Sequence, residues 1–397
     1  MDEIYMDWAA TSPVRPEVAE AMAPYLADRF GNPSSVHRWG RAARAALEEA
    51  RERLAAVLGA ARREIVFTGS GTEADNLAVL GRARAVARSG QRVIVACTAI
   101  EHKAVLEPAR QAAREGAELL VMAVDETGRL DLGALDEALA AGPAVVSVQW
   151  GNNEIGTLQP IDEVADRCRS RGITFHSDAV QALGRVPVRV DRTPCDLLTV
   201  SAHKLGGPKG VGALYVREGT ELEALIFGGG QEWELRPGTQ NVAGAVGLAV
   251  AAELAVAEME AESARIGALR DRLESGLRER IDGLVVHGAG APRLSHILNV
   301  GIPGVDQEAI LMALDLEGIA VSSGSACQSG AVEASHVLVA IGAAHATPDP
   351  DRPDPASIRF SLGRTTTSEH VDRVIDRVPE VVKRLRALGS NDLFGGL

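Results

Sequence analysis

Cysteines are few in this sequence, and none forms a close pair. The 397 residues include four cysteines, Cys97, Cys168, Cys195 and Cys327. They lie far apart and make no Cys-x-x-Cys motif, which argues against a disulfide framework and against a cysteine-ligated zinc site. We therefore expect no metal site.

An excess of positive charge is also missing. The chain has 41 Lys and Arg against 54 Asp and Glu, which gives a formal net charge of −13. This balance argues against bulk electrostatic binding to nucleic acid or to an anionic membrane.

Signals for secretion and membrane insertion are absent as well. The start, Met1-Asp2-Glu3, is acidic, and no uninterrupted apolar run reaches the length of a membrane span. We expect a cytoplasmic protein. With 46% hydrophobic residues the chain can bury a large core, and its length predicts two domains.

Short apolar runs alternate with helical patterns through the first two thirds of the chain. Such alternation predicts βα units and a mainly parallel sheet covered by helices on both faces, an α/β class in which ligands bind at the carboxyl ends of the strands. A helix is expected over 38–58, and a long helix over 242–281 is expected to connect two domains. Seven strands are predicted, at 65–68, 93–97, 119–124, 145–149, 174–178, 197–200 and 212–216.

The stretch 197–210 ends a predicted strand in Ser201-Ala202-His203-Lys204 and continues into a loop with glycines and a proline. A lysine at a strand end can lose its proton through desolvation and neighbouring charge, and it then forms a Schiff base with an aldehyde cofactor. Lys204 therefore suggests pyridoxal phosphate. A solvated lysine at the end of the strand is the simpler alternative.

A phosphate could bind where Thr68-Gly69-Ser70-Gly71-Thr72 follows a strand and opens a helix. Free amides and hydroxyls gather there at the positive end of a helix, although a capped helix after a glycine turn would show the same pattern. Just past the next strand lies His102, which could stack on an aromatic cofactor and transfer protons, or could have a purely structural role.

Three further motifs carry chemistry that suits such a cofactor. Asp178, at a strand end, could pair with a pyridinium nitrogen or could simply cap a helix. Cys327 lies among serines and glycines, which is unusual for an inert buried cysteine and makes it a candidate nucleophile. Arg359, in a strand-like alternation, could bind a substrate carboxylate or face solvent.

Taken together, these motifs resemble those of the cysteine desulfurases, pyridoxal phosphate enzymes with the class V aminotransferase fold. The resemblance covers nearly the whole chain, and the run Ser322-Ser323-Gly324-Ser325-Ala326-Cys327 resembles the subgroup with the longer cysteine loop. It implies a large cofactor-binding domain, 15–262, and a small α+β domain formed by 1–14 and 263–397. The other matching motifs include Gly31-Asn32-Pro33-Ser34-Ser35, Glu101-His102-Lys103-Ala104, Asn152-Asn153-Glu154-Ile155-Gly156 and Arg236-Pro237-Gly238-Thr239.

The resemblance also implies a role for each site residue. Lys204 would hold the cofactor, His102 would stack on its ring, and Asp178 and Gln181 would contact the ring nitrogen and ring oxygen. Asn153, which also lies against the cofactor, and Arg359 would bind the carboxylate of L-cysteine, and Cys327 would take its sulfur as a persulfide. The phosphate would be held by Gly71, Thr72, Ser201 and His203 and, from the second chain of a homodimer, by Thr239.

Sulfur would then pass from a mobile loop at about 323–333 to an acceptor protein serving iron–sulfur cluster assembly, tRNA thiolation or DNA phosphorothioation. Pro237, Glu333-Ala334 and the insertion-like loop 345–355 depart from the family pattern where an acceptor could dock. Two alternatives stay open. One is another pyridoxal phosphate reaction, such as selenocysteine lysis or transamination, and the other is a non-enzymatic scaffold.

Overall fold

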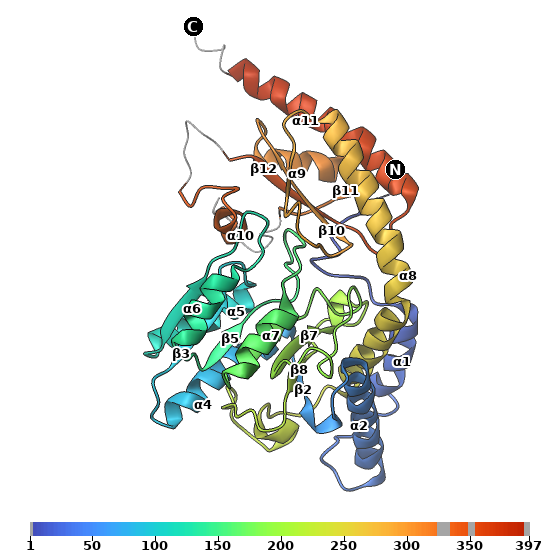
Figure 1. Cartoon of the computed structure of the whole chain (residues 1–397). Coiled ribbons are helices and arrows are strands. Elements are labelled where there is room, and N and C mark those ends of the chain that lie inside the picture. Colours follow the sequence, from blue (N-terminus) through green and yellow to red (C-terminus); the bar gives the residue numbers. More distant parts are fainter. Residues whose placement is uncertain (1–2, 324–333, 348–353, 393–397) are drawn as a thin grey trace.

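A seven-stranded sheet forms the centre of the computed structural model, which describes residues 3–323, 334–347 and 354–392 (Figure 1). The strand order is β2-β8-β7-β6-β5-β3-β4. The pairs from β7 to β4 are parallel, whereas β8 runs antiparallel to both β2 and β7. The strands are β2 (Ile65–Thr68), β3 (Ile94–Thr98), β4 (Glu118–Met122), β5 (Val145–Ser147), β6 (Phe175–Asp178), β7 (Leu197–Ser201) and β8 (Gly212–Val216).

This sheet confirms the predicted fold class. The residues of β2, β3, β5, β6 and β7 are buried throughout, because helices cover both faces of a doubly wound sheet. The connecting helices are α3 (Gly71–Asn76), α4 (Arg82–Arg88), α5 (Lys103–Arg114), α6 (Leu132–Ala140) and α7 (Ile161–Ser170).

Helix α2 has the predicted bounds, Arg38–Leu58. Its buried positions, among them Ala43, Leu47 and Leu54, recur at spacings of three or four and so form one apolar face. The helix ends because Gly59 takes φ 71°, the left-handed conformation that glycine adopts without steric penalty. With α1 (Pro16–Leu26), it packs against the first part of α8 (Val242–Arg280).

Helix α8 runs alongside both parts of the chain (Figure 1), and its side chains contribute to two separate apolar cores. Its first turns, which include Leu248 and Ala252, pack into the core around the large sheet. Farther along, Ile266, Leu273 and Leu277 pack into a second core with α11 (Ser368–Asp392). Two cores meet along one helix, and the division into 15–262 and 1–14 plus 263–397 stays a prediction.

The second core lies on a small antiparallel sheet of β9 (Val285–His287), β10 (Ile297–Ile302) and β12 (Ala356–Ser361). The N-terminal strand β1 (Ile4–Tyr5) pairs in parallel with β11 (Ile319–Ala320), which joins the first residues of the chain to this body. Helix α9 (Gln307–Leu316) packs into this second core, whereas α10 (His336–Ala340) packs against Ile100 and Ile155 and lies nearer the large sheet in Figure 1.

Among the described residues, α8 alone is long and apolar enough to cross a membrane. Within its most apolar 18-residue window, 61% of the residues are buried inside the protein, as in the core helix of a water-soluble fold.

Candidate active site

Lys204 lies in a short 3₁₀ turn, Ala202–Lys204, that follows β7 directly. Its Nζ donates hydrogen bonds to the carbonyl oxygens of Ala9 (2.6 Å) and Ala10 (2.8 Å). The N-terminal segment therefore crosses the carboxyl edge of the sheet and meets the amine there. Because the side chain turns inward onto these carbonyls, the solvated strand-end alternative does not describe Lys204.

Asp178 is the last residue of β6, the strand beside β7. Its Oδ1 accepts a hydrogen bond from the amide of Val180 (2.8 Å) in a turn that does not continue into a helix, so Asp178 does not cap a helix. Burial, and next the neighbouring carboxyl of Asp75, raises the pKa of Asp178 to about 7. A cationic group placed against this carboxyl would reverse that rise.

A polar network lies beneath Asp178 within the sheet. His176 is fully buried and hydrogen-bonds through its two ring nitrogens to the hydroxyls of Ser147 (2.8 Å) and Thr199 (3.1 Å). Its Nε2 lies 3.5 Å from Oδ1 of Asp75. Burial raises the pKa of Asp75 to about 8 and lowers the pKa of His176 to about 4, so both side chains are mainly uncharged at neutral pH.

The start of α3 forms a close-fitting cradle. A Cβ added to Gly71 would lie 3.1 Å from a methyl group of Val180 and 3.3 Å from Cβ of Ser201, so the glycine lets three segments meet. Ser70 caps the helix by accepting from the amide of Glu73 (3.1 Å). The amides of Gly71 and Thr72, in the first turn, have no intrahelical acceptor, which is the arrangement that binds phosphate.

His203 lies in the same turn as Lys204, and its Nδ1 hydrogen-bonds to the hydroxyl of Thr11 (3.2 Å). Burial and then the charge of Lys204 lower the pKa of His203 to about 4. The neutral imidazole can therefore serve as a hydrogen-bond donor or acceptor beside a phosphate.

His102 caps α5, because its Nδ1 accepts a hydrogen bond from the amide of Ala104 (3.1 Å). Burial and then Lys204 lower its pKa to about 4, which places the ring near the amine and keeps it neutral. A neutral ring is the form suited to stacking on an aromatic cofactor. His102 can therefore cap α5 and still stack on a cofactor.

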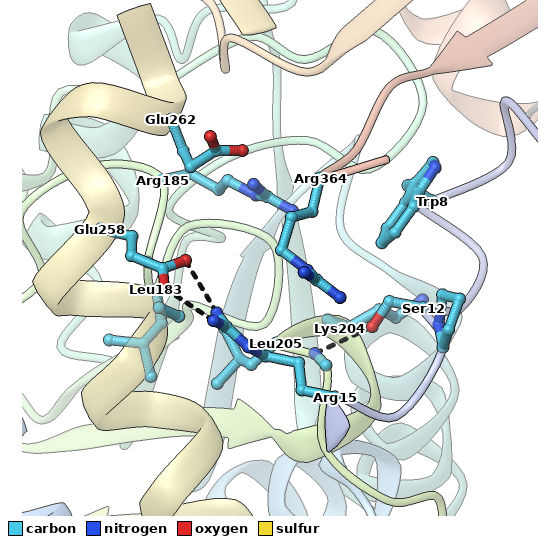
Figure 2. A pocket seen from close by; sticks show the side chains of 14 residues that line it. Trp8, Ser12, Arg15, Leu183, Arg185, Lys204, Leu205, Glu258, Glu262 and Arg364 are labelled. Carbon is cyan, nitrogen blue, oxygen red and sulfur yellow. Dashed lines mark hydrogen bonds and ion pairs between the residues drawn. The ribbon is translucent and has the colours of Figure 1, made fainter. Parts of the chain in front are cut away.

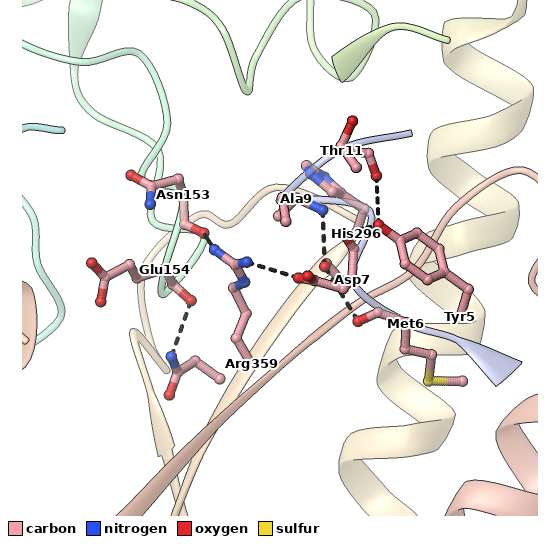
Figure 3. Close-up of polar contacts among 12 residues, drawn as sticks. Tyr5, Met6, Asp7, Ala9, Thr11, Asn153, Glu154, His296 and Arg359 are labelled. Atoms are coloured by element: carbon pink, nitrogen blue, oxygen red, sulfur yellow. Dashed lines mark hydrogen bonds and ion pairs between the residues drawn. The ribbon is translucent and has the colours of Figure 1, made fainter. Parts of the chain in front are cut away.

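Arg359, on β12, does not face solvent; its side chain is 3% exposed. Its guanidinium donates to the carbonyl of Asn153 (2.9 Å) and to Oδ1 of Asp7 (2.9 Å), as Figure 3 shows. The Nε of Arg359 is buried and has no hydrogen-bond partner among the residues that the structure describes. The structure thus brings Arg359 and Asn153 together, and Asp7 holds the arginine in place.

Gln181 also lies beside the N-terminal segment. Its Nε2 donates to the carbonyl of Ala9 (2.9 Å), and its Oε1 lies 3.3 Å from Nε2 of His296. Ala9 therefore joins Gln181 to Lys204 through a shared carbonyl acceptor.

Cys327 lies outside the described residues. The chain on either side of residues 324–333 is anchored at the site: the amide of Arg359 donates to the carbonyl of Ser322 (2.6 Å), and Ser335 donates to Oε2 of Glu154 (2.5 Å). The other three cysteines are buried, and burial raises the pKa of each thiol, to about 12 for Cys168. Because the thiolate is the reactive form and a raised pKa keeps the thiol protonated, these three cysteines are unreactive.

Thr239 is the one predicted site residue in the described chain that lies apart from the others. It is exposed in the segment before α8, and no hydrogen bond among the described residues joins it to Lys204, Asp178 or Ser201. A threonine that completes the site of another chain would lie in this way.

A cavity lies between the N-terminal segment and α8, beside Lys204 (Figure 2). Arg15 forms a two-point ion pair with Glu258 on its wall (2.8 and 2.6 Å), and Arg185 and Arg364 also line it. This ion pair ties the segment that covers Lys204 to the connecting helix.

Sequence reasoning missed several of these residues. Asp7, Asp75 and Glu101 received no role, although Glu101 is fully buried and burial raises its pKa to about 8. For two of them the available signal was position, since Asp75 lies in the motif of Thr72 and Glu101 lies beside His102; Asp7 had no such neighbour.

Comparisons with known proteins place this geometry in a family. The model of the aminotransferase class-V family matches residues 4–374. A cysteine desulfurase IscS of Dictyoglomus turgidum is 45% identical over 386 residues, which cover 97% of this chain and 96% of that protein. A solved NifS-like protein is 34% identical, with a TM-score of 0.88 over 96% of this chain and 100% of its own.

A further solved structure, described as SspA in complex with cysteine, is 33% identical, with a TM-score of 0.78 over 90% of this chain and 98% of its own. Like the motifs in the sequence, these similarities extend over almost the whole chain. The chain therefore belongs to the class-V aminotransferases and, within them, to the cysteine desulfurases, a family of pyridoxal phosphate enzymes.

Proposed function

We propose that this protein converts L-cysteine to L-alanine and takes the sulfur onto Cys327 as a persulfide, for delivery to an acceptor protein. The observation that carries the proposal is the convergence of Lys204, Asp178 and Arg359 at one edge of the sheet, beneath the N-terminal segment. The relative solved with cysteine supports the choice of substrate.

The residues present fit pyridoxal phosphate. Gly71 lets the start of α3 lie close to Val180 and Ser201, and Asp178 is a buried carboxyl suited to a pyridinium nitrogen. Thr72, Ser201 and His203 would add hydrogen bonds to the phosphate, while His102 and Gln181 would lie against the ring. When bound, the cofactor supplies an electron sink for the electrons left as the substrate Cα loses its proton.

The protein's own groups would do the rest. Lys204 would hold the cofactor, and its Nζ would accept the proton that the substrate Cα loses. The carbonyls of Ala9 and Ala10 show where that amine can dock when it is free. Arg359 and Asn153 hold the substrate carboxylate and so orient the sulfur toward the cysteine loop.

In the sulfur transfer, the Cys327 thiolate attacks the substrate sulfur. The bond from sulfur to Cβ breaks as the new S–S bond forms, and the carbon skeleton leaves as alanine after it gains protons. The two anchors at Ser322 and Ser335 put both ends of the loop at the substrate site.

We further propose a cytoplasmic homodimer in which Thr239 completes the phosphate site of the second chain. The same region exposes large apolar side chains: Phe227 is 80% exposed and Trp233 is 48% exposed. A second copy that covers this loop would bury them and receive Thr239 at the same time.

Cys327→Ala with excess L-cysteine tests the function. We expect the variant to bind the cofactor and the substrate, because neither needs the thiol, and to release neither alanine nor sulfur. The buried Cys97→Ala is the matched control and should turn over normally. Normal turnover by Cys327→Ala would remove Cys327 from the mechanism, and release of alanine from selenocysteine but not from cysteine would favour a lyase instead.

A further inference from the structure

The loop that carries Thr239 contains the most strained backbone in the described chain. Glu232, Trp233 and Glu234 have φ values of 48°, 60° and 67°, and they are the only described residues other than glycine with positive φ. This left-handed conformation crowds Cβ against the backbone, so a run of three such residues persists only where surrounding contacts impose it.

A buried ion pair between Arg51 and Glu232 holds the loop in this left-handed conformation. Glu232 receives two parallel hydrogen bonds from the guanidinium of Arg51 on α2 (2.6 and 2.7 Å). The side chain of Arg51 is 2% exposed and that of Glu232 is 1% exposed. The Arg51 guanidinium also lies 4.8 Å from the ring centre of Phe67 and 5.4 Å from that of Trp233.

The pair also fastens the loop to the large sheet. Oε2 of Glu232 accepts the amide of Phe67 on β2 (2.8 Å), and Arg51 donates to the carbonyl of Ile65 on the same strand (2.7 Å). Strand β2 leads directly into the phosphate cradle at the start of α3. Loop and cradle therefore share one rigid support.

The segment that presents Thr239 is held at both ends. On the near side, Arg236 donates to Glu73 on α3 (2.8 Å), and Glu73 in turn accepts the amide of Gly69 (2.8 Å). On the far side, the side-chain Nε2 of Gln240 donates a hydrogen bond to Oε1 of Glu232 (3.4 Å). Thr239 projects from between these two attachments.

We propose that the Arg51–Glu232 ion pair is a positioning element that fixes the loop presenting Thr239 to the cofactor phosphate of the second chain. The proposal rests on the shared phosphate site put forward above. It predicts an asymmetry that a merely stabilising ion pair would lack. Loss of the pair in one chain should weaken cofactor binding in the other chain.

Mixed dimers of two differently tagged chains provide the test. One chain carries Lys204→Ala, so that borohydride can trap cofactor only on the intact chain. We place Glu232→Gln, which keeps the shape of the side chain, on either the Lys204→Ala chain or the intact chain. On the Lys204→Ala chain it should raise the apparent Kd for pyridoxal phosphate about tenfold, the effect of weakening one charge-assisted hydrogen bond. On the intact chain the effect should be several-fold smaller.

Arg53→Met is the matched control, because Arg53 on the same helix pairs with Glu253 on α8 and does not touch the loop. Arg51→Met gives a second disruption of the pair, and circular dichroism checks that each mixed dimer is folded. An effect of Glu232→Gln equal to that of Arg53→Met, or confined to the chain that carries it, would overturn the proposal. Thr239→Ala placed in the same dimers separates the two hypotheses: if it acts across chains while Glu232→Gln does not, the shared site stands and the positioning role falls.

Discussion

At the scale of single residues, the site is notable for carboxyl groups that burial keeps protonated. Burial raises the pKa of Asp75 and Glu101 to about 8 and that of Asp178 to about 7. A group whose pKa is higher in the folded than in the unfolded state stabilises the fold most at low pH, and this contribution is lost as pH rises to the folded value. Stability of the cofactor-free protein should therefore fall between about pH 4 and pH 8.

Asp75→Asn tests this pH dependence. The amide keeps the size of the side chain but cannot ionise, so the fall in unfolding free energy with pH should become less steep, by up to about 1.4 kcal/mol per pH unit. Urea unfolding of the cofactor-free protein at pH 5 and pH 8 measures the slope. The exposed Asp282→Asn is the control. Equal slopes for wild type and Asp75→Asn would contradict the raised pKa of Asp75.

Lys204 makes a second prediction at this scale. The chain has only four lysines, Lys103, Lys204, Lys209 and Lys383, so a cofactor label can be mapped without ambiguity. Protein incubated with pyridoxal phosphate and reduced with borohydride should carry the label on Lys204, because this lysine follows β7 directly and Asp178 ends the neighbouring strand β6. Peptide mapping decides it, with Lys204→Ala as the unlabelled control. A label on Lys209 or Lys103 in the wild type would refute the assignment.

At the scale of elements, the left-handed run 232–234 makes a prediction about stability. Glu234 has φ 67°, and its side chain makes no hydrogen bond or ion pair with the residues that the structure describes. Glu234→Gly should therefore stabilise the protein by about 1 kcal/mol, because glycine adopts this conformation without the Cβ penalty.

Thermal unfolding measures the effect of Glu234→Gly. Glu221→Gly, in a nearby loop where φ is negative, is the matched control and should be neutral or destabilising, because glycine only adds freedom to the unfolded chain there. A lower melting temperature for Glu234→Gly than for wild type would show that the loop conformation is not strained at this position.

Local sequence patterns were enough to locate strands and helices, but they did not show which strands pair with each other. The bounds of β2, β8 and α2 agree with the prediction, because each is a compact buried run or one apolar face between turn residues. The antiparallel direction of β8 and the pairing of β1 with β11 depend on contacts between distant segments, which no local pattern encodes.

The site shows the same limit. Lys204 and Asp178 could be predicted because both end strands of one parallel sheet, whose carboxyl ends meet. The Asp7–Arg359 pair and the Arg51–Glu232 pair could not, since each joins charges far apart in the chain and a charged residue is ordinarily expected at the surface.

At the scale of the whole molecule, the proposal is that the function needs two chains. Each chain brings Lys204, Asp178 and Arg359 into one site and leaves Thr239 exposed. If the outward threonine completes the neighbour's phosphate site, cofactor binding and assembly are thermodynamically linked, because a ligand held by both chains stabilises the dimer over the monomers.

Dilution of the loaded protein tests this linkage. Cofactor release and dimer dissociation should share one midpoint, measured by the absorbance of bound cofactor and by sedimentation on the same samples. Thr239→Ala should release cofactor at least tenfold more readily, because one hydrogen bond to a charged group contributes about 1.5–3 kcal/mol. Thr220→Ala is the control and should match wild type, because the hydroxyl of this loop threonine makes no hydrogen bond with the residues that the structure describes. A monomer that keeps its full cofactor complement, or a Thr239→Ala dimer that binds cofactor like wild type, would show that each chain holds its cofactor alone.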